Sequence, residues 1–130
     1  MPISLTIIDV IPATPEEIYQ AWLSSEGHTA MTGGEAHASG EVGASFDAWN
    51  GYIAGTNLVL DPGKRIVQSW RSSQFKDTEP DSQIEVTLEP DPGGTQVTVT
   101  HTTVPDGGEH YEDGWKSHYF VPMKAYFGAR

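Results

Sequence analysis

The chain has 130 residues, no cysteine and a formal net charge of −11 at pH 7. We expect residues 1–130 to form a single domain, because two independent cores would have about 65 residues each, close to the lower limit for folding alone. The lack of cysteine excludes disulfides, thiolate metal sites and cysteine nucleophiles. The acidic charge argues against nucleic acid and anionic membrane surfaces as partners.

No apolar run approaches the roughly 20 residues that a membrane-spanning helix needs. The opening residues Met1 to Ser4 also lack the basic and apolar regions of a secretory signal. We therefore expect no membrane span and a cytoplasmic location.

The first segments read as a strand followed by helix. Alternating β-branched residues from Ile3 to Ile11 predict a strand. Thr14, Pro15 and Glu17 then form the pattern of a capping box with proline at the first helical position. We expect a short helix that breaks over residues 24–27, and a further helical turn over residues 28–31 that ends at two glycines.

From residue 34 to residue 104 the patterns are typical of an antiparallel sheet. We expect strands over residues 35–38, 44–49, 52–60, 65–72, 84–89 and 96–101. Asn50-Gly51 predicts a hairpin turn, because both residues tolerate a positive φ. Residues 61–63 and 90–94 predict further turns, and the polar segment 74–81 predicts a loop.

The last segment predicts a helix of about 20 residues. Asp106 is the expected N-cap, and Glu109 would complete a second capping box. Pro122 predicts a kink or local break, because it has no N–H to donate to the carbonyl of His118. Large apolar side chains recur every four residues along one face, at Tyr111, Trp115, Tyr119, Met123 and Phe127.

These elements predict an α+β helix-grip fold, in which a curved antiparallel sheet wraps around the long C-terminal helix, with short helices after the first strand. A sheet with one apolar face and a helix with one aromatic face must cover each other. Large side chains on both surfaces often leave a cavity between them, where a ligand can bind.

The segment from Thr14 to Trp22 resembles the opening helix of the START-like (SRPBCC) superfamily. Four further stretches and the closing helix are similar to the homologues of the activator of heat-shock protein 90 ATPase, in the family's order along nearly the whole chain. The resemblance implies the helix-grip fold in a single-domain member, and a chaperone as one possible partner. These stretches are residues 43–46, 51–55, 65–71, 94–101, 114–119 and 123–127.

Aromatic and histidine side chains on the two facing surfaces are the candidate cavity residues. They could line a pocket for a flat apolar ligand, or they could simply form the core. His101 shares a face with Val97 and Val99, so it could be a polar handle or general base in the cavity, or a buried histidine bonded to a neighbouring hydroxyl or carbonyl. The candidates are Phe46, Trp49, Tyr52, Trp70, His101, Trp115, His118 and Tyr119.

We expect no metal, no cofactor and no catalytic residue. His110, Asp113 and His118 lie on one predicted helix, but His110 and His118 are too far apart along it to share one ion, and no H-x-x-x-H spacing occurs. No G-x-S-x-G elbow, Walker loop or G-x-G-x-x-G motif is present.

Three functions follow in order of preference. The first is a non-enzymatic binding module that takes a small hydrophobic ligand in an apolar cavity between the sheet and the C-terminal helix. The second is an activator of the chaperone ATPase, as implied by the resemblance. The third is a cavity-based enzyme, which would need His101 and an acidic residue to point into the same void. The identity of the ligand and the oligomeric state stay open.

Overall fold

The computed structural model describes residues 2–129 and consists of one antiparallel sheet and a set of helices. The six strands lie in the order β1-β6-β5-β4-β3-β2, which confirms the predicted helix-grip fold. In chain order the elements are β1 (Ile3–Ile11), α1 (Pro15–Trp22), α2 (Ser25–Thr32), β2 (Ser45–Ala48), β3 (Ile53–Asp61), β4 (Arg65–Ser72), β5 (Ser82–Asp91), β6 (Gly94–Val104), α3 (His110–Trp115), η1 (Lys116–Phe120) and α4 (Val121–Gly128).

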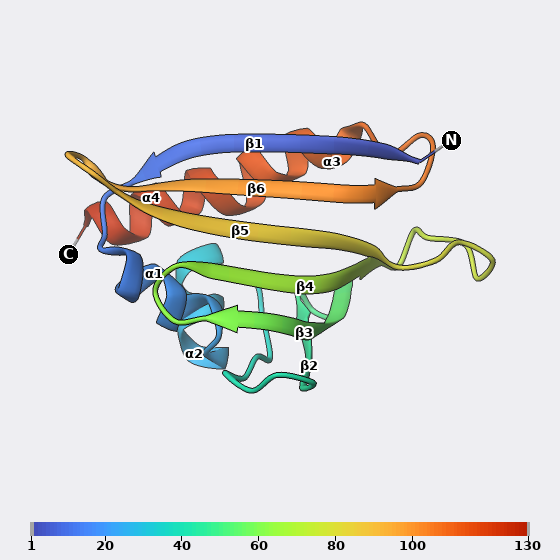
Figure 1. The fold of residues 1–130 in the computed structure, drawn as a ribbon, viewed down its shortest axis with the longest axis horizontal. Helices are drawn as coiled ribbons and strands as arrows, with labels where there is room; N and C mark the ends of the chain where they lie inside the picture. Colours follow the sequence, from blue (N-terminus) through green and yellow to red (C-terminus); the bar gives the residue numbers. More distant parts are fainter. Residues whose placement is uncertain (1, 130) are drawn as a thin grey trace.

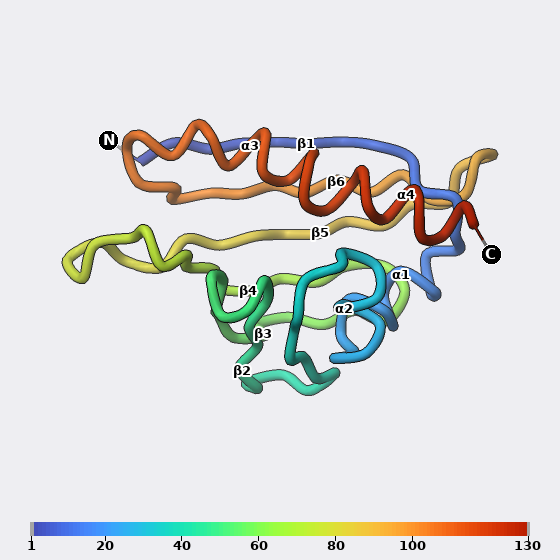
Figure 2. The backbone as a smooth tube through the Cα atoms, turned by 180° about the vertical axis from the view of Figure 1, so that it is seen from behind, coloured from blue at the N-terminus to red at the C-terminus, as the bar shows by residue number. Residues whose placement is uncertain are grey.

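The sheet is curved, and the helices lie on one face of it (Figures 1 and 2). The C-terminal helical segments α3, η1 and α4 follow one another along the β1, β6 and β5 side (Figure 2). Helices α1 and α2 lie beside the β4–β3 side, and α2 contacts α4. The terminal helix and the β2–β3 hairpin therefore face each other across the concave side of the sheet.

The start of α1 is as predicted. The Thr14 hydroxyl accepts a hydrogen bond from the backbone N–H of Glu17, and the Glu17 carboxylate accepts one from the N–H of Thr14. Helix α2 differs from the prediction, because it begins at Ser25 within the segment where we expected a break. The side chain of Ser24 caps it by accepting from the N–H of Gly27, so a residue expected to interrupt a helix starts a new one.

The strands follow the predicted pattern with small shifts in their ends. The predicted strand 35–38 is absent, and a single bridge between His37 and Asp47 takes its place. The predicted strand 44–49 is shortened because Trp49 and Asn50 have φ values of 52° and 58°, and Gly51 follows at 86°. Three consecutive left-handed residues cannot continue a strand, so the turn begins at Trp49, one residue earlier than predicted.

The C-terminal helix contains the expected irregularity near Pro122. The five residues of η1 form a π-helical turn between α3 and α4, and Pro122 lies in the first turn of α4. A π turn forms i→i+5 hydrogen bonds and so departs from the α pattern where the proline N–H is missing. The irregularity predicted near Pro122 is therefore present as a π turn, while the helical segments follow one another without a gap from His110 to Gly128.

The predicted N-terminus of this helix is wrong. The helix begins at His110 with Glu109 as N-cap, and no side-chain hydrogen bond caps it. Residues 106–109 form turns, in which the N–H of Gly108 donates to the carbonyl of Pro105. Because this turn closes before the helix starts, the Asp106–Glu109 capping box does not form.

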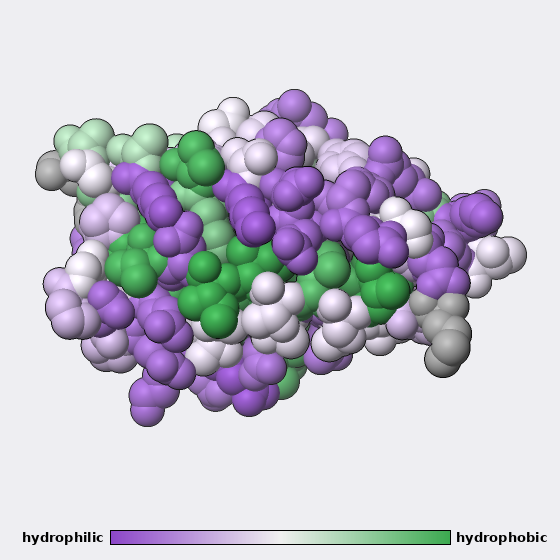
Figure 3. Space-filling model, turned by 90° about the horizontal axis from the view of Figure 1, so that it is seen from above, coloured by the Kyte–Doolittle hydropathy of each residue, from purple (hydrophilic) through white to green (hydrophobic). Residues whose placement is uncertain are grey.

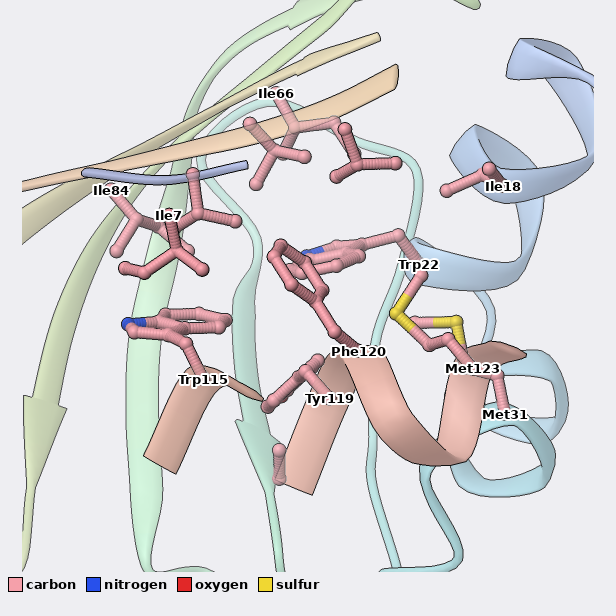
Figure 4. Packing of buried hydrophobic residues seen from close by; sticks show 14 of the residues in the cluster. Ile7, Ile18, Trp22, Met31, Ile66, Ile84, Trp115, Tyr119, Phe120 and Met123 are labelled. Atoms are coloured by element: carbon pink, nitrogen blue, oxygen red, sulfur yellow. The ribbon is translucent and has the colours of Figure 1, made fainter. Parts of the chain in front are cut away.

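One hydrophobic core joins the sheet to the helices, and every helix and strand contributes a buried residue to it. The alternation along β5 and β6 is confirmed: Ile84, Val86 and Val99 are buried on the concave face, as is His101. Figure 4 shows Trp115, Tyr119 and Phe120 projecting from the terminal helix toward isoleucines of the sheet and toward Trp22 of α1.

The edge strands of the sheet are β1 and β2. Figure 3 looks onto the molecule from the β1 side and shows hydrophobic side chains in areas separated by hydrophilic ones. Such scattered exposure is ordinary for a protein surface. Among the helices formed within residues 2–129, none has the length and apolar character needed to cross a membrane.

Candidate functional site

A partly open pocket of about 500 Å³ lies between the terminal helix and the β2–β3 hairpin. Residues of the turn before β3, of β3 and of β4 form one side of it, and residues of α3 and η1 form the other. The curvature of the sheet keeps the two sides apart, and large side chains fill only part of the gap.

Six of the eight candidate residues line this pocket: Trp49, Tyr52, Trp70, Trp115, His118 and Tyr119. Phe46 and His101 do not. Phe46 is buried opposite Gly55, where an added Cβ would lie 2.7 Å from the Phe46 ring. The missing side chain of Gly55 lets the Phe46 ring lie against the sheet, away from the pocket lining.

Six lining residues were not among the predicted cavity residues: Ile53, His110, Tyr111, Asp113, Gly114 and Ser117. All except Ile53 belong to the terminal helical segment. His110, Gly114 and Ser117 are spaced i, i+4 and i+7, so they form a helical stripe beside the buried face. This stripe is the signal that could have indicated them, once one side of the helix was known to face a void.

His101 occupies a closed hydrogen-bond chain behind the pocket wall. Its Nδ1 accepts from the indole N–H of Trp115 at 3.1 Å, so its Nε2 carries the proton and donates to the Ser82 hydroxyl at 2.8 Å. Ser82 in turn donates to the carbonyl of Trp70 at 2.7 Å. Burial lowers the pKa of His101 to about 4. Of the two interpretations of His101, this geometry corresponds to the buried histidine bonded to a neighbouring hydroxyl, and not to a polar handle in the cavity.

A second buried histidine, His28, holds Tyr119 in place. Its Nδ1 lies 2.9 Å from the carbonyl of Trp22 and must donate to it. Its Nε2 therefore accepts from the Tyr119 hydroxyl at 2.8 Å. Burial lowers the pKa of His28 and raises the pKa of Tyr119. Helix α2 thus fixes one aromatic wall of the pocket through two neutral polar groups.

A polar cluster surrounds Gln74 at one end of the pocket. The Gln74 side-chain oxygen accepts from the Tyr52 hydroxyl at 3.0 Å and lies 3.1 Å from Nε2 of His110. Tyr111 shares a short hydrogen bond with the Ser72 hydroxyl. Burial is the main reason that the pKa of Tyr111 is raised. These bonds join the loop after β4 to the first turn of α3.

Trp49 is held in an unusual position at the opposite wall. Its backbone lies in the left-handed region, and its ring packs on Gly34, where an added Cβ would come within 2.4 Å of it. The rings of Trp49 and His118 meet edge to face, with centroids 5.2 Å apart. The buried indole N–H of Trp49 has no hydrogen-bond partner in the part of the chain that the structure describes.

The walls consequently present mainly ring surfaces. The polar atoms of Tyr52, Tyr111, Trp115 and Tyr119 are already bonded to protein groups. A ligand in the pocket would meet apolar faces and gain chiefly from burial and stacking. The charged and polar groups at the rim come from the helix, and Asp113 is the one carboxylate in the lining.

The arrangement expected for a cavity-based enzyme, with His101 and an acidic residue facing the same void, is not seen in this pocket: His101 lies outside its lining, in which Asp113 is the one carboxylate. Over residues 2–129, no three histidine, aspartate or glutamate side chains are grouped so that they could hold a metal ion.

Comparison with known proteins identifies the fold and the family. Residues 12–128 match the family model described as "Activator of Hsp90 ATPase homolog 1-like protein". The chain is 30% identical over 127 residues to an activator of 90 kDa heat shock protein ATPase homolog of Dictyostelium discoideum. It is 26% identical over 125 residues to the activator of 90 kDa heat shock protein ATPase homolog 1 of Homo sapiens. These alignments cover 95% of this chain but only 33% and 37% of those proteins, so the chain spans about a third of their length.

Solved structures share the fold over nearly the whole chain. An HSP90 activator from Plasmodium falciparum superposes with a TM-score of 0.85 at 20% identity, covering 97% of this chain and 96% of that one. The Aha1 dimer from Colwellia psychrerythraea superposes with a TM-score of 0.78 at 22% identity, covering 95% and 96%.

Proposed function

We propose that this chain, which belongs to the family of activator of Hsp90 ATPase homolog 1-like proteins, is a non-enzymatic binding module for a small hydrophobic ligand. The observation that carries the proposal is the pocket of about 500 Å³ beneath the terminal helix. Its volume falls within the range of about 300–1,000 Å³ typical of small-molecule sites, and its walls are aromatic.

The preformed state of these walls also supports binding. Trp115 and Tyr119 are each bonded to a buried histidine, so their rings need little reordering when a ligand enters. Preorganised side chains reduce the entropy lost on binding. While the space between these rings is empty it lowers stability, because the side chains that line it lose packing contacts, and a bound ligand would restore such contacts.

A thermal-shift screen tests this proposal with fatty acids, sterols and aromatic polyketides. A ligand at a hundred times its Kd should stabilise the fold by about 2.7 kcal/mol. Ser117→Trp should reduce the shift, because Ser117 lines the pocket and a large side chain there would occupy it. Ala125→Trp, at an exposed position of α4 outside the lining, is the matched control. If no hydrophobic class stabilises the protein, the proposal fails.

A second candidate function is activation of the Hsp90 ATPase, and the observation in its favour is the family match. Because the chain spans about a third of the relatives with that name, their activity as whole proteins is a hypothesis for this chain. Adding the purified chain to Hsp90 from the same organism and measuring ATP turnover tests it. An unchanged rate at saturating concentration would remove this candidate.

We propose further that the sheet and its helices form one domain, as expected for residues 1–130. The shared core, with a buried residue from every element, supports this proposal. Urea unfolding should then give one transition that is the same by tryptophan fluorescence and by circular dichroism. Two separated transitions would contradict it.

A further inference from the structure

The pocket lining has an acidic side chain but no lysine or arginine. Its one carboxylate is that of Asp113. Across the described residues, the Asp113 carboxylate takes part in no ion pair, while the nearby Lys116 is paired with Glu112 at 3.4 Å. The protein as a whole carries a net charge of −11. Apart from the imidazoles of His110 and His118, a bound anion would therefore find no basic side chain in the pocket lining.

The aromatic walls, like the negative charge, favour a cationic ligand. The lining includes Trp49, Tyr52, Trp70, Tyr111, Trp115 and Tyr119. The face of an aromatic ring carries negative electrostatic potential, and indole attracts cations most strongly. Since the hydroxyl and N–H groups of most of these rings are bonded to protein groups, ring surface is what a ligand meets.

We propose that this pocket selects an organic cation: an amine with an aromatic body, whose rings lie between the aromatic walls and whose ammonium group faces Asp113. The inference rests on the proposed function, and it narrows the ligand class from hydrophobic molecules in general to cationic ones. The ammonium group at the rim keeps water on one side, because Asp113 is exposed, so its desolvation is small. Fatty acids are selected against, because their carboxylate would lie beside Asp113.

The test uses three compounds with one shared body: 1-naphthylmethylamine, 1-naphthylmethanol and 1-naphthoate. Isothermal titration calorimetry gives the three affinities. The measurement is made at about pH 8, because an ordinary histidine in water is neutral there. The amine should bind about tenfold more tightly than the alcohol. The naphthoate should bind most weakly. The ratio of amine to alcohol affinity is the decisive quantity, because it cancels the contribution of the naphthyl rings.

Asp113→Asn should bring this ratio close to one. Glu89→Gln is the control: it removes the same charge at an exposed position of β5, outside the pocket lining, and should keep the ratio. Urea unfolding of both variants verifies that they fold. Asp113→Lys should invert the order, so that the naphthoate binds more tightly than the amine.

The inference is overturned if the alcohol binds as tightly as the amine, or if Asp113→Asn and Glu89→Gln change the ratio equally. In either case the proposed function stands, because naphthyl compounds still bind. If none of the three compounds binds, the inference also fails, and the wider screen of neutral hydrophobic classes then decides the proposed function separately.

Discussion

Trp115 belongs both to the core and to the pocket wall. Its side chain is 3% exposed, its ring stacks on Trp22 with centroids 6.2 Å apart, and its N–H donates to His101. It also lines the pocket. Core packing and ligand contact are therefore not exclusive at this residue, because one edge of the indole is buried in the sheet while another part borders the void.

We predict that Trp115→Ala lowers the free energy of unfolding by about 3–5 kcal/mol, because it removes a large buried ring and leaves the Nδ1 of His101 without its donor. Urea unfolding measures the loss. Tyr126→Ala is the control on the same helical segment, where the side chain is 39% exposed, and should cost less. Equal losses in the two variants would contradict the buried role of Trp115.

His101 should make stability depend on pH. Its pKa is about 4 in the folded protein because of burial, against an ordinary 6.5. Between these values the unfolded chain binds more protons, so the free energy of unfolding is at its full value above about pH 6.5 and falls by roughly 3 kcal/mol toward pH 4. The pKa of His28 is also lowered by burial and acts in the same direction.

Urea unfolding over this pH range, together with an NMR titration of the His101 ring, checks the prediction. His101→Gln should make the decline shallower, because glutamine does not titrate. The pKa of the exposed His37 is raised by its hydrogen bond to Asp47, so that residue acts in the opposite direction. A His101 titration midpoint close to 6.5 would contradict the structure.

At the scale of elements, the terminal helix shows how a repeat and a backbone irregularity fit together. An ideal α-helix turns about 100° per residue, so a repeat of four drifts by about 40° per step and by about 160° from Tyr111 to Phe127. All five residues of this repeat are nevertheless buried. The π turn at η1 accommodates one extra residue, which cancels about 100° of the drift.

The β3–β4 pairing depends on Gly55. A Cβ added there would lie 1.9 Å from the carbonyl oxygen of Ser69. We predict that Gly55→Ala costs about 1–3 kcal/mol or more, because backbone atoms of two paired strands must separate. Chemical unfolding measures this, with Gly40→Ala as control, since nothing lies within 4 Å of a Cβ added at Gly40. Similar costs at both glycines would contradict the close approach.

At the scale of the whole molecule, the net charge of −11 should weaken the folded state through self-repulsion. We predict that raising NaCl from about 0.02 M to about 0.3 M raises the melting temperature, because the Debye length falls to below about 10 Å. KCl should have the same effect if the cause is screening. A melting temperature that falls with salt would show that the surface ion pairs outweigh the repulsion.

Much of the fold follows from the sequence because its information is local. The capping box at Thr14 and Glu17 and the alternation along β5 and β6 need only residues close together in the chain. The Asp106 cap failed because a turn closed by Gly108 and Pro105 competes for the same residues. The strand predicted over residues 35–38 failed because only one bridge, between His37 and Asp47, pairs it with the sheet.

The sequence by itself determined which faces of the strands and of the terminal helix are buried, because side-chain direction follows the periodicity of the backbone. Only the tertiary structure decided what lies between those faces. Phe46 packs over Gly55, His101 is enclosed by Trp115 and Ser82, and Asp113 borders the pocket. Periodicity places a residue on a face, but whether a neighbour fills the space beside it depends on contacts between residues far apart in the chain.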